Sequence, residues 1–260
     1  MKISMIISTF NRANLLARSL ERLSHLTLPD ELIVIDDGGT DNTKEVCEAA
    51  PSSLPIQYLY NDNPGSTICS KARNIGVKLA RNEWIVTSEP ELIYRTDVLQ
   101  QFRDLHEDYS EEIVSAGKVY FAPEGWVGPE FGNYAPPQGA QEAIGWVAPY
   151  TGLWKKEWLM ELGGWDEEFP GPWGWDDIDL LTRLRINGHG QHIDLGVEGI
   201  HQFHGIGGDV NFINEAHFFK KSFTHGQVNH QCTDGCPQKP EDLTDLIANR
   251  GHEWGKIKNA

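Results

Sequence analysis

The stretch ELIVIDDGG, residues 31–39, decides the fold class of this chain. Its apolar run from Leu32 to Ile35 has the length of a strand, and an unbroken apolar run of this kind is typical of a strand buried on both faces. Asp36 and Asp37 follow at once, and two glycines then turn the chain. Such a strand predicts a parallel sheet, in which ligands bind beyond the carboxyl ends of the strands.

Strands and helices are expected to alternate around this stretch. Apolar runs predict strands at residues 3–8, 31–37, 55–60 and 84–87. Helical spacing predicts helices at residues 15–26, 40–50, 70–80 and 97–109. In the second of these helices, Asp41 or Asn42 suits the N-cap. The alternation requires crossover connections, so it predicts an α/β fold with a mainly parallel, twisted sheet flanked by helices.

The second half of the chain has a different pattern. Pro123–Gly145 is rich in glycine, proline and aromatic residues, which favours a long functional loop. A short helix is expected at Lys155–Leu162, an amphipathic helix at 178–188, and a strand at Gln191–Leu195. From Thr224 onward the chain is polar and is expected to form a tail or a small appendage.

Composition excludes several classes of function. The 260 residues carry a formal charge of −16, so a nucleic-acid partner and adsorption to anionic lipid are both disfavoured. A phosphorylated ligand would need a divalent cation to offset this negative field. No apolar stretch approaches the roughly 20 residues that span a bilayer, and the N-terminal apolar run is too short for a signal peptide. A cytoplasmic location without a transmembrane segment is therefore expected, and the oligomeric state stays open.

The four cysteines do not form a disulfide framework for a chain of this size. Cys232 and Cys236 lie close together, with His225 and His230 upstream. This spacing is compatible with a structural zinc site, with a disulfide or with two free thiols, and the sequence does not choose among them.

Three polar groups follow the ends of predicted strands. They are Thr9-Phe10-Asn11-Arg12, Asp36-Asp37 and Glu89-Pro90-Glu91. Carboxylates that converge at one edge of a sheet repel one another unless a cation or a donor-rich ligand binds them. The simpler interpretation is that each group caps a helix or is solvated, but three such groups at strand ends favour a binding site.

Four segments, in the same order, resemble glycosyltransferases of the GT-A fold. MIISTFNRANLLARSLERL (5–23), LIVIDDGGTDNT (32–43) and SKARNIGVKLARNEWIV (70–86) resemble the inverting family that includes cellulose, chitin and chondroitin synthases. GGWDEEFPGPWGWDDIDLLTRLRINGHG (163–190) is similar to a block shared by chondroitin polymerases and β-1,4-galactosyltransferases. The resemblance covers roughly residues 3–205 and implies a Rossmann-like GT-A sheet.

The resemblance also implies how the chain is divided. Residues 1–205 would form the glycosyltransferase domain, with a nucleotide-sugar half at about 1–95 and an acceptor half, which carries the catalytic residues, at about 96–205. Residues 206–260 would be a C-terminal extension, an appended helix and loop on the acceptor side.

On the donor side, the resemblance implies roles for individual residues. Thr9, Asp36 and Asp37 would hold the uracil and ribose of a UDP-sugar, and Arg73 would close over the base. The remaining donor-side positions are expected at Asn11, Arg12 and Glu89.

The acid-x-acid metal motif of the family falls on Glu89-Pro90-Glu91. Relatives usually have aspartates there, and glutamate offers the same charge and oxygen donors on a longer arm. Glu91 is the expected direct ligand, while Glu89 would act through water or the donor's ribose. His204, with His201 three residues earlier, would complete the shell. Carboxylate and imidazole ligands suit Mn²⁺ and are compatible with Mg²⁺.

The acid pair of the last block falls on Asp176 and Asp177. Inverting transfer needs a carboxylate that accepts the proton of the attacking hydroxyl, so Asp177 is the expected base and Asp176 would bind the acceptor. The alternative is that both acids only favour a helix N-terminus. Trp173 and Trp175 offer flat surfaces for a sugar ring, although Trp175 fits a core position equally well.

The expected function is a metal-dependent inverting glycosyltransferase that moves a hexose from a UDP-sugar to a hydroxyl of a glycan or glycoconjugate. The resemblance favours galactose or an N-acetylhexosamine. Two alternatives stay open: a catalytically inactive sugar-binding module, and a nucleotidyltransferase acting on a sugar phosphate. The second would need a Gly-rich basic loop after the first strand, and STFNRANLL is not one.

Overall fold

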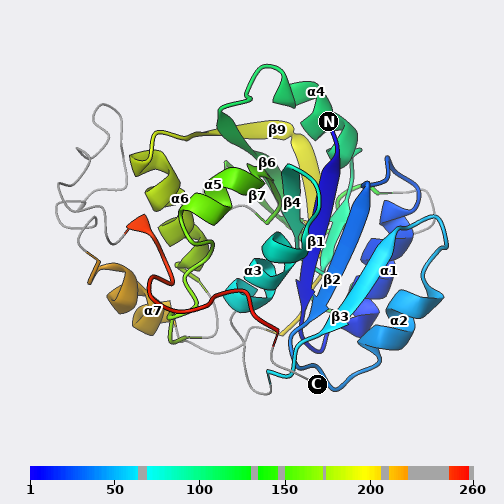
Figure 1. Ribbon diagram of the computed structural model, residues 1–260. Coiled ribbons are helices and arrows are strands. Elements are labelled where there is room, and N and C mark those ends of the chain that lie inside the picture. The colour runs from blue at the N-terminus through cyan, green and yellow to red at the C-terminus, as the bar shows by residue number, and fades with distance from the viewer. Residues whose placement is uncertain are drawn as a thin grey trace.

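A computed structural model describes residues 1–63, 69–129, 134–145, 150–171, 174–205, 211–221 and 246–257. These ranges form a mixed sheet flanked by helices on both faces (Figure 1). Its strands are β1 (Ile3–Thr9), β2 (Glu31–Asp36), β3 (Ile56–Tyr60), β4 (Trp84–Ser88), β5 (Leu92–Tyr94), β6 (Glu112–Phe121), β7 (Gln141–Ile144), β8 (Gly152–Lys155) and β9 (Gly190–His201). Its helices are α1 (Ala13–Leu23), α2 (Thr43–Ala49), α3 (Cys69–Leu79), α4 (Val98–His106), α5 (Lys156–Glu161), α6 (Asp176–Ile186) and α7 (Asn211–Phe218). Across the described ranges, every helix is too short or too polar to cross a bilayer.

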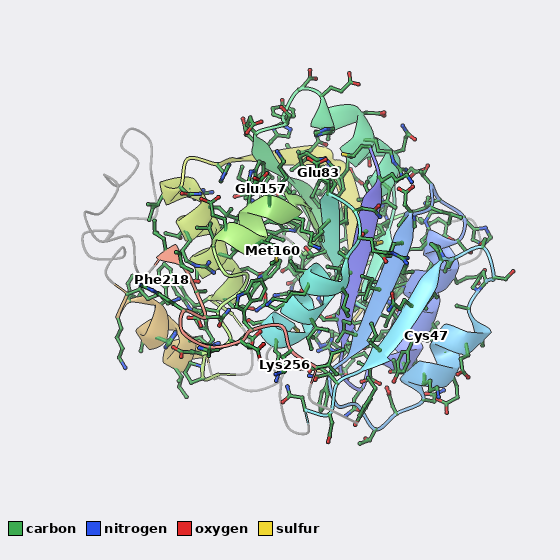
Figure 2. The ribbon with its side chains drawn as sticks, viewed as in Figure 1. Cys47, Glu83, Glu157, Met160, Phe218 and Lys256 are labelled. Atoms are coloured by element: carbon green, nitrogen blue, oxygen red, sulfur yellow. The ribbon has the colours of Figure 1, made fainter. Side chains whose placement is uncertain are left out.

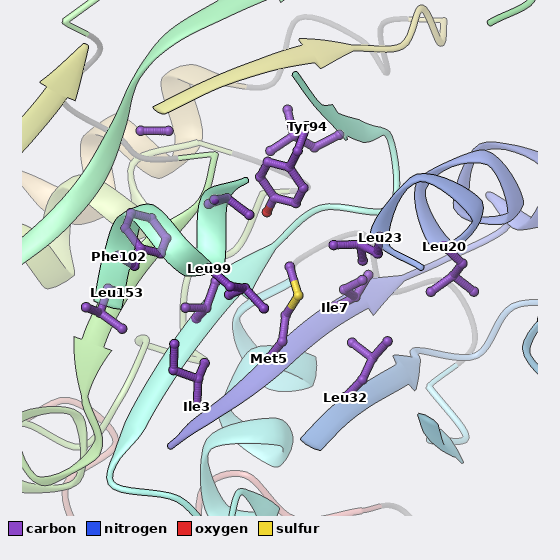
Figure 3. Close-up of a cluster of buried hydrophobic side chains, with 14 of the residues drawn as sticks. Ile3, Met5, Ile7, Leu20, Leu23, Leu32, Tyr94, Leu99, Phe102 and Leu153 are labelled. Carbon is purple, nitrogen blue, oxygen red and sulfur yellow. The ribbon is translucent and has the colours of Figure 1, made fainter. Parts of the chain in front are cut away.

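The first half of the sheet is parallel, as its apolar runs predict. Its strands lie in the order β3-β2-β1-β4, and each neighbouring pair is parallel. Ile3, Met5 and Ile7 of β1 pack in one core cluster with Leu20 of α1 (Figure 3). Ile6 points to the opposite face and packs in a second cluster with α3. Both faces are therefore covered, which explains why β1 reads as a continuous apolar run.

The second half of the sheet departs from the expected parallel pattern. β8 pairs antiparallel with β4 and with β6, and β5 pairs antiparallel with β9. Among the described residues of this half, β6 and β9 are the one parallel pair. The expectation of a mainly parallel sheet therefore holds for the first half, and the whole sheet is mixed. Antiparallel strands do not need a crossover connection between them. The alternation of helices and strands in the sequence therefore does not predict such pairs.

Several strands of the second half differ from the sequence-based expectation. The interpretation of Pro123–Gly145 as a loop is wrong at its end, where β7 pairs with β6. β7 is partly exposed and has little apolar pattern of its own, so its partner strand decides its conformation. β6 and β8 were not expected at all, and the strand expected at Gln191–Leu195 continues to His201 as β9.

The described parts of residues 206–260 pack onto the main core. Phe218 of α7, labelled in Figure 2, and Leu246 are buried in the cluster that contains α3 and α6. Further along, the Asn249 side chain donates hydrogen bonds to the carbonyls of Gly163 and Trp165. The division at residue 205 remains a proposal, because these segments share one hydrophobic core with the rest of the chain.

Asp166 contacts α7 and the residues directly after it through charged side chains. Its carboxylate lies 2.7 Å from Lys221 Nζ and 3.1 Å from His217 Nε2, and it accepts a hydrogen bond from the Glu168 N–H. Burial works to raise the pKa of Asp166, but Lys221 and these hydrogen bonds outweigh it and lower the pKa from 3.8 to about 2. The carboxylate is therefore held in its charged form in the folded state.

We expect Asp166→Asn to lower the free energy of unfolding by about 2 kcal/mol at pH 6. The folded pKa lies below the unfolded one, so this stabilisation is fully present above about pH 4 and is lost as the pH falls through 2. Urea denaturation at several pH values measures it. Glu168→Gln, a change at an exposed carboxylate, is the control. A difference that stays constant from pH 6 to pH 2 would contradict a role for the Asp166 charge.

Candidate active site

The strand register brings the polar residues together at one edge of the sheet. β1 and β2 end side by side, because Thr9 pairs with Asp36. β4 is joined to β5 by the turn Glu89–Glu91, which is called the acidic turn below. β5 pairs with β9 so that Leu92 lies opposite His201. This pairing places a histidine from the end of β9 beside the acidic turn, more than 100 residues away in sequence.

Asp36 and Asp37 are buried and already hydrogen-bonded. The Tyr58 hydroxyl donates to Asp36 at 2.9 Å, and the side chains of Asn61 and Asn63 donate to Asp37. Burial raises the pKa of Asp36 above its ordinary value. None of these three partners was predicted from the sequence. The polar run that contains Asn61 and Asn63 could have indicated those two, because it follows the third strand at the same sheet edge as the two aspartates.

Thr9 ends β1, and Asn11 and Arg12 lie in the turn between β1 and α1. The Thr9 hydroxyl is buried and has no hydrogen-bond partner within the described ranges. Asn11 has a φ of 52°, a left-handed conformation that asparagine tolerates, and its side-chain oxygen accepts from the Thr40 N–H at 2.7 Å. Arg12 reaches the acidic turn and lies 2.7 Å from Glu91.

Glu91, His201 and His204 form a cluster suited to a metal ion. Each offers one ligand atom, and these atoms lie within 4.8 Å of one another. His204 Nε2 is 3.1 Å and His201 Nε2 is 3.7 Å from the same oxygen of Glu91. Glu91 Oε2 and His204 Nε2 are buried without a hydrogen-bond partner among the described residues. Because unpaired buried polar atoms are costly, a cation that binds both fits this cluster.

The two glutamates of the acidic turn have pKa values that are shifted in opposite directions. Burial favours a higher pKa for Glu91, but His204, Arg12 and His201 hold its pKa below the ordinary value. Burial, and then the neighbouring Glu91, raise the pKa of Glu89 to about 8. Burial also lowers the pKa of His201 to about 4, which keeps its imidazole neutral. An ionised carboxylate beside neutral imidazole is the form in which these groups bind a cation.

Asp176 and Asp177 form a second acidic group in the first turn of α6. Asp176 accepts hydrogen bonds from the Ser70 hydroxyl at 3.0 Å and from Arg73 at 3.1 Å. Burial and the neighbouring Asp177 raise the pKa of Asp176 to about 6. Asp177 accepts from Trp165 Nε1 at 2.7 Å and from Arg73 at 3.1 Å, in both cases through Oδ1. Its side chain is 21% exposed against 9% for Asp176, so Asp177 is the more accessible acid.

Arg73 joins the two acidic groups. Its guanidinium lies 3.1 Å from both Asp176 and Asp177 and 3.6 Å from Glu89. Burial alone would lower the pKa of Arg73, but Asp177 and the neighbouring acids raise it, so the charge is retained. Arg73 thus contacts carboxylates of α6 and of the acidic turn. These contacts give no support to the expectation that Arg73 closes over a nucleotide base.

We expect Arg73→Ala to lower the free energy of unfolding by about 3 kcal/mol, because it leaves buried carboxylates without their cation. The loss is expected to shrink at lower pH, where those carboxylates take up protons. Urea denaturation measures it. Lys44→Ala is the control, since Lys44 and its partner Glu48 are 62% and 65% exposed and the change is expected to alter stability by less than about 1 kcal/mol. Equal losses in the two variants would argue against the bridging role of Arg73.

Trp175 lies directly before the two aspartates, in a left-handed conformation with a φ of 69°. It is partly buried, and its ring centroid lies 5.3 Å from that of Phe218 and 5.5 Å from that of Phe219. Its ring therefore packs on α7, and its role toward a sugar stays a prediction. Trp173 lies outside the described residues. So do His225, His230, Cys232 and Cys236, the positions considered for zinc.

Comparison with known proteins identifies the family of this sequence. Residues 4–145 match the model of glycosyl transferase family 2. Over 220 residues the chain is 29% identical to validoxylamine A glucosyltransferase from Streptomyces hygroscopicus subsp. jinggangensis, covering 72% of this chain and 52% of the relative. It is 23% identical to chondroitin synthase from Pasteurella multocida, covering 72% and 23% respectively. The chain thus spans about half the length of the first relative and about a quarter of the second.

Solved structures share the fold. TarS residues 1–349 from S. aureus, in complex with UDP-GlcNAc, superimposes with a TM-score of 0.62 at 17% identity over 80% of this chain and 60% of that one. The mannosyltransferase PcManGT from Pyrobaculum calidifontis, in complex with GDP-Man and Mn²⁺, gives 0.57 at 19% identity over 76% and 56%. These likenesses confirm the expected GT-A fold class.

Proposed function

Since the chain belongs to glycosyl transferase family 2, we propose that it transfers a hexose from a UDP-sugar to a hydroxyl of a glycan or glycoconjugate, with a divalent metal and with inversion. The observation that carries the proposal is the joining of two acidic groups through one arginine. Arg73 contacts Asp177 of one group and Glu89 of the other, next to the metal-ligand cluster around Glu91. Arg73 thus holds the proposed proton acceptor close to the proposed cation site.

The donor nucleotide is assigned to the ends of β1 and β2. Thr9 offers a buried hydroxyl without a partner among the described residues, and Asp36 and Asp37 are fixed by their own hydrogen bonds. Fixed carboxylates suit recognition of ribose hydroxyls or a base N–H. The TarS structure with UDP-GlcNAc supports a uridine nucleotide, whereas the PcManGT structure holds GDP-Man. Asn11 and Arg12 would face the phosphates from the same turn.

Glu91, His201 and His204 would hold the metal, for which Mn²⁺ is preferred. A bound divalent cation would neutralise the diphosphate and stabilise the departing UDP. Arg12, which is 2.7 Å from Glu91, supplies a positive charge on the same side. In a chain of net charge −16, these two sources of positive charge make diphosphate binding electrostatically feasible.

Asp177 would act as the general base. In a single displacement, the acceptor oxygen attacks the anomeric carbon while the bond from that carbon to the diphosphate oxygen breaks, and the hydroxyl proton passes to Asp177. Trp165 and Arg73 hold Oδ1, which orients the carboxylate and leaves Oδ2 for the proton. Asp176, held by Ser70, would bind the acceptor beside it.

The transferred sugar is proposed only as a hexose. The named relatives are a glucosyltransferase, a mannosyltransferase and a protein solved with UDP-GlcNAc. An N-acetylhexosamine fits this set, while galactose finds no counterpart among these three. The acceptor is proposed only as a hydroxyl of a glycan or glycoconjugate.

The test is to incubate the protein with individual UDP-hexoses and Mn²⁺ and to measure release of UDP. We expect release from at least one donor, lost on chelation of the metal and restored by Mn²⁺. Calorimetric titration with UDP and Mn²⁺ measures binding separately from turnover. Neither binding nor turnover with any UDP-hexose, with or without metal, would overturn the proposal.

A further inference from the structure

We propose that Asn214 of α7 is a positioning residue for the turn that carries Trp175 and Asp177, so that α7 belongs to the catalytic unit. This inference rests on the proposed function, because it concerns the residue assigned as its base. Asn214 lies in the C-terminal segment that the sequence presents as an extension, and neither the family match at residues 4–145 nor the pattern at 163–190 reaches it.

Asn214 makes hydrogen bonds to two glycines that precede α6. Its side-chain oxygen accepts from the Gly171 N–H at 2.6 Å, and its side-chain nitrogen donates to the Gly174 carbonyl at 2.9 Å. The side chain is 1% exposed. A Cβ on Gly171 would lie 2.7 Å from the Asn214 oxygen, so any other residue there would displace the amide. The amide oxygen and the amide nitrogen thus each bind one of these two glycines.

The bond to Gly174 acts on backbone that is intrinsically unfavourable. Gly174 and Trp175 are both left-handed, with φ values of 85° and 69°, and α6 begins at the next residue. The Gly174 carbonyl belongs to the peptide plane whose rotation sets the φ of Trp175. A bulky residue in this conformation is maintained only where surrounding contacts determine it. Asn214 therefore fixes the direction in which the Trp175 ring and the first turn of α6, with Asp177, leave the turn.

The remaining contacts of α7 make it a firm support. α7 lies next to α6 (Figure 1). Phe218, one turn after Asn214, is buried in the core, and Lys221 pairs with Asp179 at 2.5 Å and with Asp166 at 2.7 Å. Asn214 and Phe218 are four residues apart, which places them on one side of α7, and Lys221 lies three residues beyond the end of the helix. A positioning residue is effective when its own support is rigid, and this anchoring provides it.

The experiment compares Asn214→Ala and Asn214→Asp with the wild-type chain. The aspartate keeps an acceptor for the Gly171 N–H but cannot donate to Gly174, so the bond to the strained plane is lost and a carboxylate oxygen faces the Gly174 carbonyl. We expect both variants to lower kcat for UDP release from UDP-glucose and UDP-GlcNAc about tenfold, while KM and the Kd for UDP with Mn²⁺ change by less than about twofold. In hydrogen–deuterium exchange, peptides that cover residues 171–179 are expected to exchange faster.

Asp97→Ala is the matched control, because Asp97 also makes two hydrogen bonds to one distant residue, Thr27, and touches no site residue. It is expected to lower thermal stability without changing kcat or exchange at residues 171–179. Unchanged kcat in the Asn214 variants, or a loss of UDP affinity as large as the loss of kcat, would overturn the proposal. If the wild-type chain released no UDP, the proposed function would fail, and the exchange measurement alone would still decide the role of Asn214.

Discussion

Asp177→Asn is expected to lower the rate of UDP release about 1,000-fold while leaving the Kd for UDP with Mn²⁺ within about twofold. The amide cannot accept the hydroxyl proton, but it keeps the shape of the carboxylate and an oxygen for the Trp165 and Arg73 hydrogen bonds. Ground-state binding of the donor is therefore preserved, and only the proton transfer is lost. Steady-state release of UDP and calorimetric titration measure the two quantities separately.

Asp108→Asn, at an exposed carboxylate of the loop after α4, is the control and is expected to leave both quantities unchanged. A second variant, Asp177→Glu, keeps the carboxylate on a longer arm and is expected to retain part of the activity. Full activity in Asp177→Asn would remove this residue as the base. Retained sugar binding in a wild-type chain that never turns over would instead favour the inactive sugar-binding module.

Glu91→Ala is expected to weaken the affinity for Mn²⁺ more than 100-fold and to abolish the metal-dependent part of UDP binding. The variant removes the carboxylate that both histidines approach, at 3.1 and 3.7 Å. Changes that only touch a ligand's neighbours already cost about 10- to 100-fold in metal affinity, so loss of a ligand exceeds that range. Titration of Mn²⁺ followed by its EPR signal measures the affinity without any need for turnover.

Glu89→Gln is the matched comparison within the same turn. Glu89 has a raised pKa and contacts Arg73, so we expect its loss to weaken Mn²⁺ binding about tenfold or less. His204→Ala should behave like Glu91→Ala, because its Nε2 lies 3.1 Å from the Glu91 carboxylate and is one of the three ligand atoms of the cluster. Metal-dependent UDP binding that survives in Glu91→Ala would show that the cation binds elsewhere.

Local sequence patterns were sufficient for the first half of the fold. β1 and β2 are buried on both faces, so their apolar runs carry the signal that predicts a parallel sheet. The same patterns located Asp36, Asp37 and Glu91, because polar residues directly after a buried strand are conspicuous. They did not reveal β6 and β8, whose strand character depends on neighbouring strands far away in the sequence.

The candidate site was likewise predicted only in part from the sequence. Resemblance predicted the acids of the turn and of α6 as site residues, and the structure adds that Arg73 lies between their carboxylates, while its closing over a base stays a prediction. Asn61 and Asn63 were not predicted, although the polar run after the third strand marked their position, and Asn214 was not predicted because a lone amide in a polar segment has no pattern that separates it from a solvated one. Their importance appears only when the partner group is seen at hydrogen-bond distance.

By itself the sequence determined the family, the strand–helix alternation of the first half, and which acids end its strands. These features are local, since an apolar run and the polar residue that follows it are read from adjacent positions. The tertiary structure alone decided that His201 lies beside the acidic turn, that Arg73 joins both acidic groups, and that α7 reaches the turn before α6. Such contacts depend on strand register and helix packing, which bring together residues that no spacing along the chain relates.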